Sequence, residues 1–281
     1  MRDYISEKLI IYSEGKPMKL IVLKPTKAKL PADKTPGILW IHGGGYATGM
    51  AAMVYMSRAI DLVKKYGAVV ISPEYRLSGK AAYPAALEDC YAALLYLRNN
   101  CADLGCSSER LMVGGESAGG GLTAALCIHA RDKGEVNIAF QMPLYPMIDD
   151  RDTPSSADNH GISWNTRRNH AAWKLYLRDL EGKHVPPTAA PARCEDFSGL
   201  PPAYTFVGDR EAFYCETLDY VERLKTAGIS AKADVYPTGF HAFDMLLPFR
   251  KISRQAIECF EKEYLFAAEN YVCPQNGKKG E

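Results

Sequence analysis

Short apolar runs and amphipathic segments alternate along most of the chain. Eight runs are rich in apolar or β-branched residues and are bounded by glycine, proline or charged residues, which is typical of strands. They span residues 5–12, 18–24, 37–42, 68–75, 111–115, 139–146, 203–208 and 232–237. The first two lie on either side of the turn sequence SEGKP, and the later ones are nearly continuous in apolar residues. Such strands favour a mostly parallel sheet that is covered on both faces.

The segments between these runs carry apolar residues at helical spacing. Three inner faces are clearest: Met53, Met56, Ile60 and Val63 before Gly67; Leu87, Tyr91 and Leu94 after Pro84; Leu218, Val221 and Leu224 before Gly228. Glycine after a helix and proline at its start are ordinary boundary signals. Strands that alternate with helices in this way predict an α/β fold.

Residues 151–199 interrupt the alternation. They are rich in Asp, Asn, Pro and Arg and contain aromatic residues, but no clear strand. A long interruption inside a compact domain is typical of a functional insertion such as a lid. We therefore predict one domain over residues 1–273 with a cap inserted at about 151–199, followed by a disordered tail over 274–281.

Composition narrows the choice of function class. The chain has 281 residues, is 47% hydrophobic and carries a formal net charge of +1, with acidic and basic residues mixed along its length. The absence of a basic stripe argues against a nucleic-acid partner. No apolar run reaches the roughly 18 residues expected of a membrane-spanning helix, and the first residues do not resemble a secretory signal.

The eight cysteines suggest a reducing compartment. None forms a C-x-x-C pair or stands beside histidines at zinc-finger spacing. We interpret them as small core residues rather than as disulfides or metal ligands. The expectation is a cytoplasmic protein without a structural metal.

Ser117 is the candidate nucleophile. It is the centre of Gly115-x-Ser117-x-Gly119, directly after a predicted strand and directly before a helical pattern. A nucleophile elbow needs a tight strand-to-helix turn, and the flanking glycines allow neighbouring backbone to pass closely. The alternative is a glycine-rich turn that includes a serine by chance.

A second glycine run argues against that alternative. HGGG, residues 42–45, follows the strand at 37–42. Attack by a serine on an ester produces an oxyanion, which needs preorganised donors such as backbone N–H groups. One donor can come from Ala118, the residue after the nucleophile, and the others from a glycine-rich loop on a neighbouring strand. These glycines therefore predict an oxyanion hole.

Five sequences together resemble the hormone-sensitive-lipase-like branch of the α/β-hydrolases. They are HGGG (42–45), YRLSGKAAYPAALED (75–89), GESAGG (115–120), LYPMID (144–149) and GFHAF (239–243). The resemblance covers about residues 35–270. It implies an eight-stranded hydrolase sheet, no metal or organic cofactor, and hydrolysis of carboxylic esters with short acyl chains. It also implies that Gly44, Gly45 and Ala118 supply the oxyanion donors, while His42 and Gly43 shape the loop.

The sequence departs from the family in two places. The residue before the nucleophile is usually Asp and here is Glu116, a change that leaves the chemistry intact. Family members often carry extra N-terminal helices, but here only about 40 residues precede HGGG, and they are predicted strands. The cap must then come mainly from 151–199, and the pocket is either more open or completed by a second subunit, as in a homodimer.

His241 is the candidate base. It is the one histidine in the last third of the chain and follows the final predicted strand. There it can take the proton of Ser117 and return it to the leaving alcohol. Besides His42 in the HGGG loop, the remaining histidines lie in a helix (His129) or in the insertion (His160, His170 and His184) and are expected to pack, to lie at the surface or to contact substrate.

The acid remains open between two carboxylates. Asp209 and Glu211 both follow the strand at 203–208, and either can accept the Nδ1–H of the histidine. The family usually has Asp followed by Pro at this point. Counting from LPPA places Glu211 there, with Ala212 in place of proline. The resemblance therefore favours Glu211, with Asp209 as the alternative acid.

These residues predict a serine carboxylesterase acting on small-molecule esters. Tyr145 and Met147, together with the small residues of the HGGG loop, suggest a narrow slot for acetyl to about hexanoyl groups. The alternatives are a peptidase or amidase with the same triad, and a ligand-binding protein on a hydrolase scaffold. A peptidase would need an extra domain to bind its substrate, and a binding protein would be expected to lack a triad member.

Overall fold

The strands of the molecule form one sheet. The computed structural model describes residues 3–275. The strands are β1 (Tyr4–Ser13), β2 (Lys16–Pro25), β3 (Pro36–Ile41), β4 (Val69–Pro73), β5 (Ser107–Glu116), β6 (Phe140–Leu144), β7 (Ala203–Gly208) and β8 (Ala231–Tyr236). Their spatial order is β1-β2-β4-β3-β5-β6-β7-β8. The pairs β1–β2 and β2–β4 are antiparallel and the other pairs are parallel. The predicted mostly parallel, eight-stranded sheet is confirmed.

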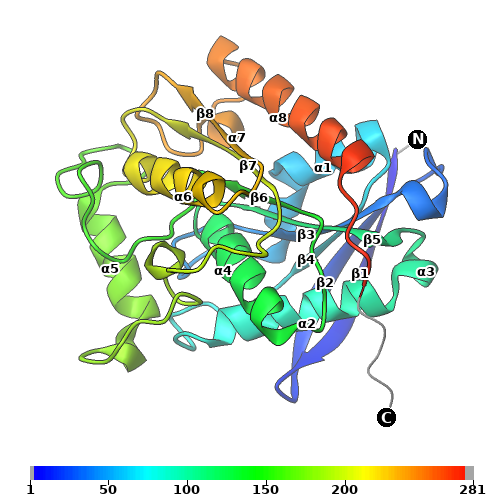
Figure 1. The fold of residues 1–281 in the computed structure, drawn as a ribbon, viewed down its shortest axis with the longest axis horizontal. Coiled ribbons are helices and arrows are strands. Elements are labelled where there is room, and N and C mark those ends of the chain that lie inside the picture. The colour runs from blue at the N-terminus through cyan, green and yellow to red at the C-terminus, as the bar shows by residue number, and fades with distance from the viewer. Residues whose placement is uncertain (1–2, 276–281) are drawn as a thin grey trace.

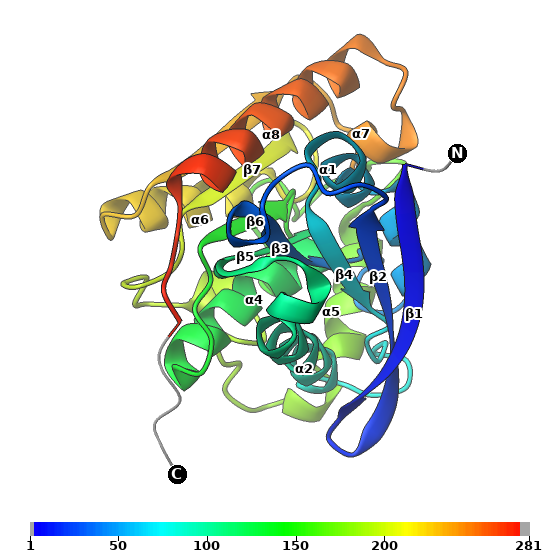
Figure 2. The same cartoon turned by 90° about the vertical axis from the view of Figure 1, so that its right-hand side faces the viewer.

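Helices cover both faces of this sheet. The α-helices are α1 (Arg58–Tyr66), α2 (Ala85–Asn99), α3 (Cys101–Leu104), α4 (Ala118–Lys133), α5 (Thr166–Tyr176), α6 (Tyr214–Thr226), α7 (Phe243–Leu246) and α8 (Lys251–Asn270). Short 3-10 helices are η1 (Ala32–Lys34), η2 (Ala51–Met56), η3 (Arg178–Leu180) and η4 (Pro191–Arg193). Figures 1 and 2 show α1 and α8 on one face and α2 and α4 on the other.

Two hydrophobic cores follow from the alternation of side chains along each strand. In β3, Leu39 and Ile41 belong to the core under α2 and α4, whereas Ile38 and Trp40 belong to the core under α1 and α8. All four side chains are fully buried. Burial on both faces explains why the central strands are nearly continuous in apolar residues.

One predicted helix is divided in the structure. The sequence predicted one helix with an apolar face over residues 53–63. In the structure this stretch is divided between η2 and α1, and α1 begins only after Ser57. The Ser57 hydroxyl accepts a hydrogen bond from the Ala59 N–H and caps the new helix. Met56 is consequently exposed rather than directed into the core. The serine N-cap was the signal for this break.

The insertion at 151–199 contains α5, η3 and η4 but no strand. In Figure 1, α5 lies beyond one end of the sheet, away from the β1–β2 hairpin. Gln275, the last described residue, lies against the start of β5, where its side-chain amide donates to the Ser108 carbonyl oxygen and accepts from the Asn137 N–H. The rest of the tail that was predicted to be disordered, 276–281, lies outside the described residues. No helix within residues 3–275 combines the length and the apolar character needed to cross a membrane.

Candidate active site

Ser117 occupies the turn between β5 and α4. Its φ of 59° and ψ of −120° lie in a region that L-residues rarely adopt. A Cβ on Gly115 would lie 2.4 Å from the Ile41 carbonyl oxygen, and one on Gly119 would lie 2.1 Å from the same atom. The two flanking glycines are therefore required by the close approach of β3. This arrangement is the strained strand-to-helix turn that a nucleophile elbow needs.

Each glycine in the run after β3 is required for a different local reason. Gly44 has a φ of +122°, and a Cβ there would lie 2.2 Å from the Thr48 carbonyl oxygen. Gly45 has a φ of +59°, and its Cβ would lie 2.5 Å from the ring of Trp164 in the insertion. Gly43 approaches the nucleophile, since its Cβ would lie 3.2 Å from the serine Cβ. Each position excludes a side chain.

This loop and the start of α4 contain backbone N–H groups without hydrogen-bond partners. Within residues 3–275, the N–H groups of Gly44, Gly45 and Ala118 make no hydrogen bond to a backbone or side-chain acceptor. Ala118 is the first residue of α4, where a helix leaves its N–H groups without intrahelical partners. Free N–H groups at this place can stabilise negative charge that develops on a substrate oxygen.

His42 supports the loop from within the core. Its ring stacks on Tyr75, with the ring centroids 4.2 Å apart. Its Nδ1 lies 2.8 Å from the Gly43 carbonyl oxygen. Burial lowers the pKa of this histidine, against the opposing effect of the Gly43 hydrogen bond. A neutral His42 therefore shapes the loop without adding charge to it.

His241 joins the nucleophile to a carboxylate. Its Nε2 lies 2.8 Å from the Ser117 Oγ, and its Nδ1 lies 2.5 Å from the Glu211 Oε2. All three side chains are buried. A serine hydroxyl, an imidazole and a carboxylate in this order form the hydrogen-bonded chain of a catalytic triad.

The two candidate acids occupy different environments. Glu211 is 1% exposed at its side chain, and its second oxygen accepts a 2.6 Å hydrogen bond from the Gly208 N–H. Asp209 is 39% exposed and pairs with Arg210 at 3.3 Å. Glu211 is therefore the carboxylate that contacts His241, whereas Asp209 pairs with Arg210.

Three aromatic rings surround the imidazole of His241. The ring centroids of Phe213, Tyr145 and Trp164 lie 5.0, 5.1 and 6.3 Å from that of the histidine. Phe213 and Trp164 were not assigned to the site from the sequence, although the aromatic residues of the insertion were a signal for Trp164. These rings restrict the positions that the imidazole can adopt.

The structure corrects the prediction that Tyr145 and Met147 line the acyl slot. Tyr145 and Met147 are fully buried and so do not line an open slot. Tyr145 instead donates its hydroxyl hydrogen to Asp244 at 2.8 Å and holds its ring edge-on to His241. A buried phenol needs such a partner, which fixes the direction of the ring.

An ionisable cluster lies behind the elbow. Glu116 accepts the indole N–H of Trp40 at 2.9 and 3.0 Å. Burial, reinforced by the negative charge of Asp244, raises the pKa of Glu116 to about 8. Asp244 pairs with Arg58 at 3.2 Å, yet burial still raises its pKa. The protein environment therefore favours the protonated form of Glu116.

Metal-ligating side chains are dispersed. Within residues 3–275, no three His, Cys, Asp or Glu side chains lie together in an arrangement that could hold a metal ion. The eight cysteines, all of which lie in that range, are free thiols, and five of them are buried.

Comparisons with known proteins agree with this geometry. A family model described as the α/β hydrolase fold matches residues 38–245. Carboxylesterase NlhH of Mycobacterium tuberculosis is 31% identical over 216 residues, which cover 75% of this chain and 67% of the relative. Esterase LipI of the same species is 31% identical, with 75% of this chain and 66% of the relative covered.

Solved structures show the same likeness over a longer stretch. A bacterial heroin esterase matches with a TM-score of 0.86 and 33% identity, covering 95% of this chain and 84% of its own. Esterase LipW from Mycobacterium marinum matches with a TM-score of 0.86 and 29% identity, covering 95% and 82%. The chain therefore belongs to the hormone-sensitive-lipase-like branch of the α/β-hydrolase family and is a carboxylic ester hydrolase.

Proposed function

We propose that this chain hydrolyses short-chain carboxylic esters through an acyl-enzyme on Ser117. The observation that carries the proposal is the hydrogen-bonded chain from Ser117 Oγ through His241 to Glu211, at 2.8 and 2.5 Å. Its geometry gives the serine a general base and gives that base a fixed orientation.

Acylation follows from these contacts. His241 Nε2 accepts the hydroxyl proton as Ser117 Oγ attacks the ester carbonyl carbon. The carbonyl oxygen becomes an oxyanion beside the N–H groups of Gly44, Gly45 and Ala118, which donate to it. Collapse of this intermediate breaks the bond to the alcohol oxygen, which takes the proton from His241.

Deacylation repeats the same steps with water. His241 removes a proton from a water molecule, which attacks the acyl carbon and regenerates the oxyanion. Collapse then breaks the bond to Ser117 Oγ, and the serine recovers its proton as the acid is released. Throughout, Glu211 accepts the Nδ1–H and stabilises the imidazolium.

The insertion acts as a cap in this proposal. Trp164 lies against Gly45 and within ring contact of His241, so an insertion residue borders the reacting centre. Ser155 and Asn159 hydrogen bond to the loop that carries Glu211. A cap that covers the site and supports its acid fits residues 151–199.

The nucleophile is tested by Ser117→Ala. With 4-nitrophenyl butyrate as substrate, we expect kcat to fall by at least about 10³-fold, since the residual rate depends on binding and on the oxyanion donors alone. Ser230→Ala, at an exposed serine whose hydroxyl contacts Tyr271, is the matched control and should keep wild-type kcat. Hydrolysis at the wild-type rate by pure Ser117→Ala would refute the mechanism.

The acyl range is tested with 4-nitrophenyl esters of increasing length. Trp164 lies against Gly45, and its ring centroid is 6.3 Å from that of His241, so long chains have little room at the reacting centre. We expect kcat/KM to be highest between acetyl and about hexanoyl and to fall at least about tenfold for palmitoyl. Efficient hydrolysis of an emulsified long-chain triglyceride would contradict this range.

A further inference from the structure

The segment that follows β6, residues 147–149, contacts three parts of the active site. The Met147 N–H donates to the carbonyl oxygen of Ser117 at 3.0 Å. The Met147 carbonyl oxygen accepts the hydroxyl of Tyr46, the residue after the glycine run, at 2.7 Å. The Ile148 carbonyl oxygen accepts the N–H of Ala192 in the insertion at 3.1 Å. This segment therefore joins the nucleophile, the oxyanion loop and the insertion.

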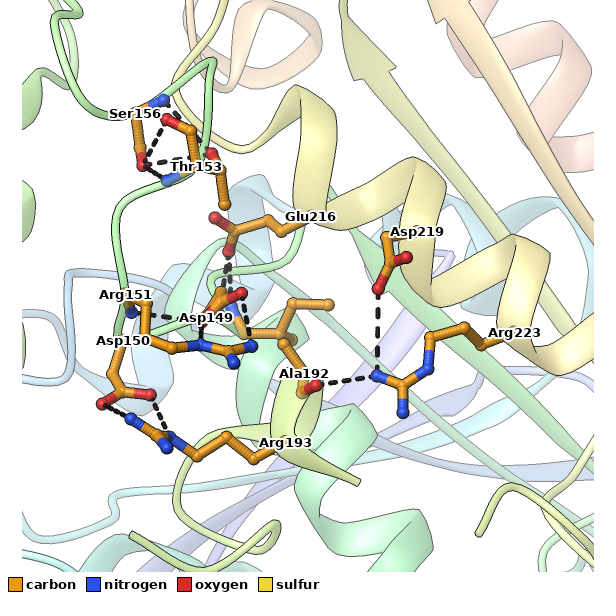
Figure 3. Close-up of polar contacts among 11 residues, drawn as sticks. Asp149, Asp150, Arg151, Thr153, Ser156, Ala192, Arg193, Glu216, Asp219 and Arg223 are labelled. Carbon is orange, nitrogen blue, oxygen red and sulfur yellow. Dashed lines mark hydrogen bonds and ion pairs between the residues drawn. The ribbon is translucent and has the colours of Figure 1, made fainter. Parts of the chain in front are cut away.

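A fourth contact comes from Glu216 on α6. Its Oε1 accepts hydrogen bonds from the N–H groups of Ile148 and Asp149 at 2.7 and 3.2 Å. Figure 3 shows the carboxyl group of Glu216 reaching from the helix to this backbone. Helix α6 continues directly from the loop of the acid, since the Tyr214 N–H donates to the Glu211 carbonyl oxygen at 3.3 Å. One side chain thus connects the acid side of the site to the nucleophile side.

The neighbouring carboxylates have arginine partners of their own. Asp149 pairs with Arg151 at 2.8 and 3.0 Å, and Asp150 pairs with Arg193 at 2.6 and 2.9 Å (Figure 3). Glu216 is 2% exposed and has no cation partner among residues 3–275, where its Oε2 also lacks a hydrogen-bond partner. The side-chain contacts of Glu216 are the hydrogen bonds that it accepts from the N–H groups of Ile148 and Asp149.

Burial raises the pKa of Glu216 well above its ordinary value, and the negative charges of Asp149 and Glu211 act in the same direction. The two backbone hydrogen bonds oppose that shift but do not outweigh it. A neutral side chain with one well-placed acceptor oxygen is therefore sufficient for these contacts. Glutamine offers the same acceptor at the same reach.

We propose that Glu216 is a positioning residue that fixes the triad acid relative to the nucleophile by bridging α6 to residues 147–149. The inference rests on the proposed function, because it concerns the alignment of Ser117 and Glu211. Loss of the bridge leaves two backbone N–H groups unpaired and frees α6 to shift. A displacement of about 1 Å at a reacting group is enough to cost on the order of 10²-fold in rate.

Two substitutions distinguish the role of the Glu216 acceptor oxygen from that of its negative charge. We expect Glu216→Gln to keep kcat within about threefold of wild type, because the amide oxygen accepts both N–H groups. We expect Glu216→Ala to lower kcat by about 10- to 100-fold while KM changes by less than about threefold, because alignment is lost and substrate contacts remain. Glu222→Ala, at an exposed position of the same helix, is the control and should match wild type.

The measurements are kcat, KM and the pH profile of kcat/KM with 4-nitrophenyl butyrate, together with thermal unfolding. In Glu216→Ala the pH profile of kcat/KM should differ from that of wild type, since the contact between His241 and Glu211 loosens. A purely structural role would lower the unfolding temperature and leave both kcat and the profile unchanged, which would overturn the proposal. Equal losses in the Gln and Ala variants would overturn it as well.

A further variant covers the case in which Glu216→Ala does not fold. Glu216→Asp keeps the carboxyl but shortens its reach, and the proposal requires a kcat between those of the Gln variant and of Ser117→Ala. Wild-type kcat in Glu216→Asp would contradict it. Failure of the proposed function is distinct, because Ser117→Ala would then hydrolyse the ester as fast as wild type.

Discussion

The nucleophile side and the acid side of the site are held by different means. On the nucleophile side, β3 and β5 are neighbours in the sheet, and Ile41 pairs with Gly115 shortly before the glycine loop and the turn that carries Ser117. The backbone of one turn packs directly against the other, so that glycines at 43, 115 and 119 leave no room for a Cβ. The position of Ser117 is thus set by main-chain contacts between two adjacent strands.

The acid side depends on side chains from elsewhere in the chain. The Ser155 hydroxyl accepts the Cys215 N–H at 3.0 Å and donates to the Ala212 carbonyl oxygen at 2.8 Å. The amide of Asn159 donates to the Arg210 carbonyl oxygen at 3.2 Å. Both side chains belong to the insertion. The comparison teaches that a serine fixed by main-chain contacts can be paired with a carboxylate whose loop is held by side chains of residues 151–199 and, as proposed above, by Glu216.

The largest expected effect tests which carboxylate completes the acid side. In Glu211→Gln, the amide nitrogen faces His241 Nδ1 and favours the tautomer that cannot accept the serine proton. We expect kcat on 4-nitrophenyl butyrate to fall by about 10³-fold or more, and Asp209→Asn to stay within about threefold of wild type. The assignment is wrong if the Asn variant carries the larger loss.

The next effect tests the rigidity of the nucleophile side. Gly44→Ala places a Cβ 2.2 Å from the Thr48 carbonyl oxygen at a φ of +122°, so the loop must shift and its donors move with it. We expect kcat to fall by on the order of 10²-fold, as for the loss of an oxyanion donor. The control is Gly79→Ala, whose Cβ meets no atom within 4 Å. Unchanged kcat in Gly44→Ala would show that this turn tolerates displacement.

The smallest effect concerns stability rather than rate. Glu116 has a pKa of about 8 in the folded protein against an ordinary value of 4.5. Because the folded-state pKa is raised, its contribution to stability is fully present below pH about 4.5 and is lost as the pH rises toward about 8. Glu116→Gln removes that loss while the amide oxygen still accepts the Trp40 N–H.

We therefore expect Glu116→Gln to exceed wild type in unfolding free energy by on the order of 1–3 kcal/mol at about pH 8, and by much less at about pH 5. Urea unfolding at the two pH values measures the difference. Glu7→Gln, at an exposed position of β1, serves as the control. Parallel pH dependences for Glu116→Gln and wild type would contradict the assignment of this titration to Glu116.

The same contrast explains what could be predicted from the sequence. Ser117 and the glycine loop could be predicted from the sequence because the backbone geometry of such turns requires particular residues at fixed spacing. Asp209 and Glu211 both follow β7, and the resemblance only favoured Glu211, whereas its contacts with His241 and the Gly208 N–H distinguish it in the structure. Tyr145 was placed on the correct segment but in the wrong role, because its partner Asp244 lies far along the chain. Contacts between distant side chains leave no periodic signal.

The strand order has a consequence for how the protein folds. Gly44, Ser117, Glu211 and His241 follow β3, β5, β7 and β8, which are distant in sequence. Contacts of this kind form late, since each requires the closure of a long loop. Local helices such as α2 can form in a refolding chain before any of these residues meet. Recovered ester hydrolysis would therefore report assembly of the sheet across those strands, whereas recovered helical signal would not.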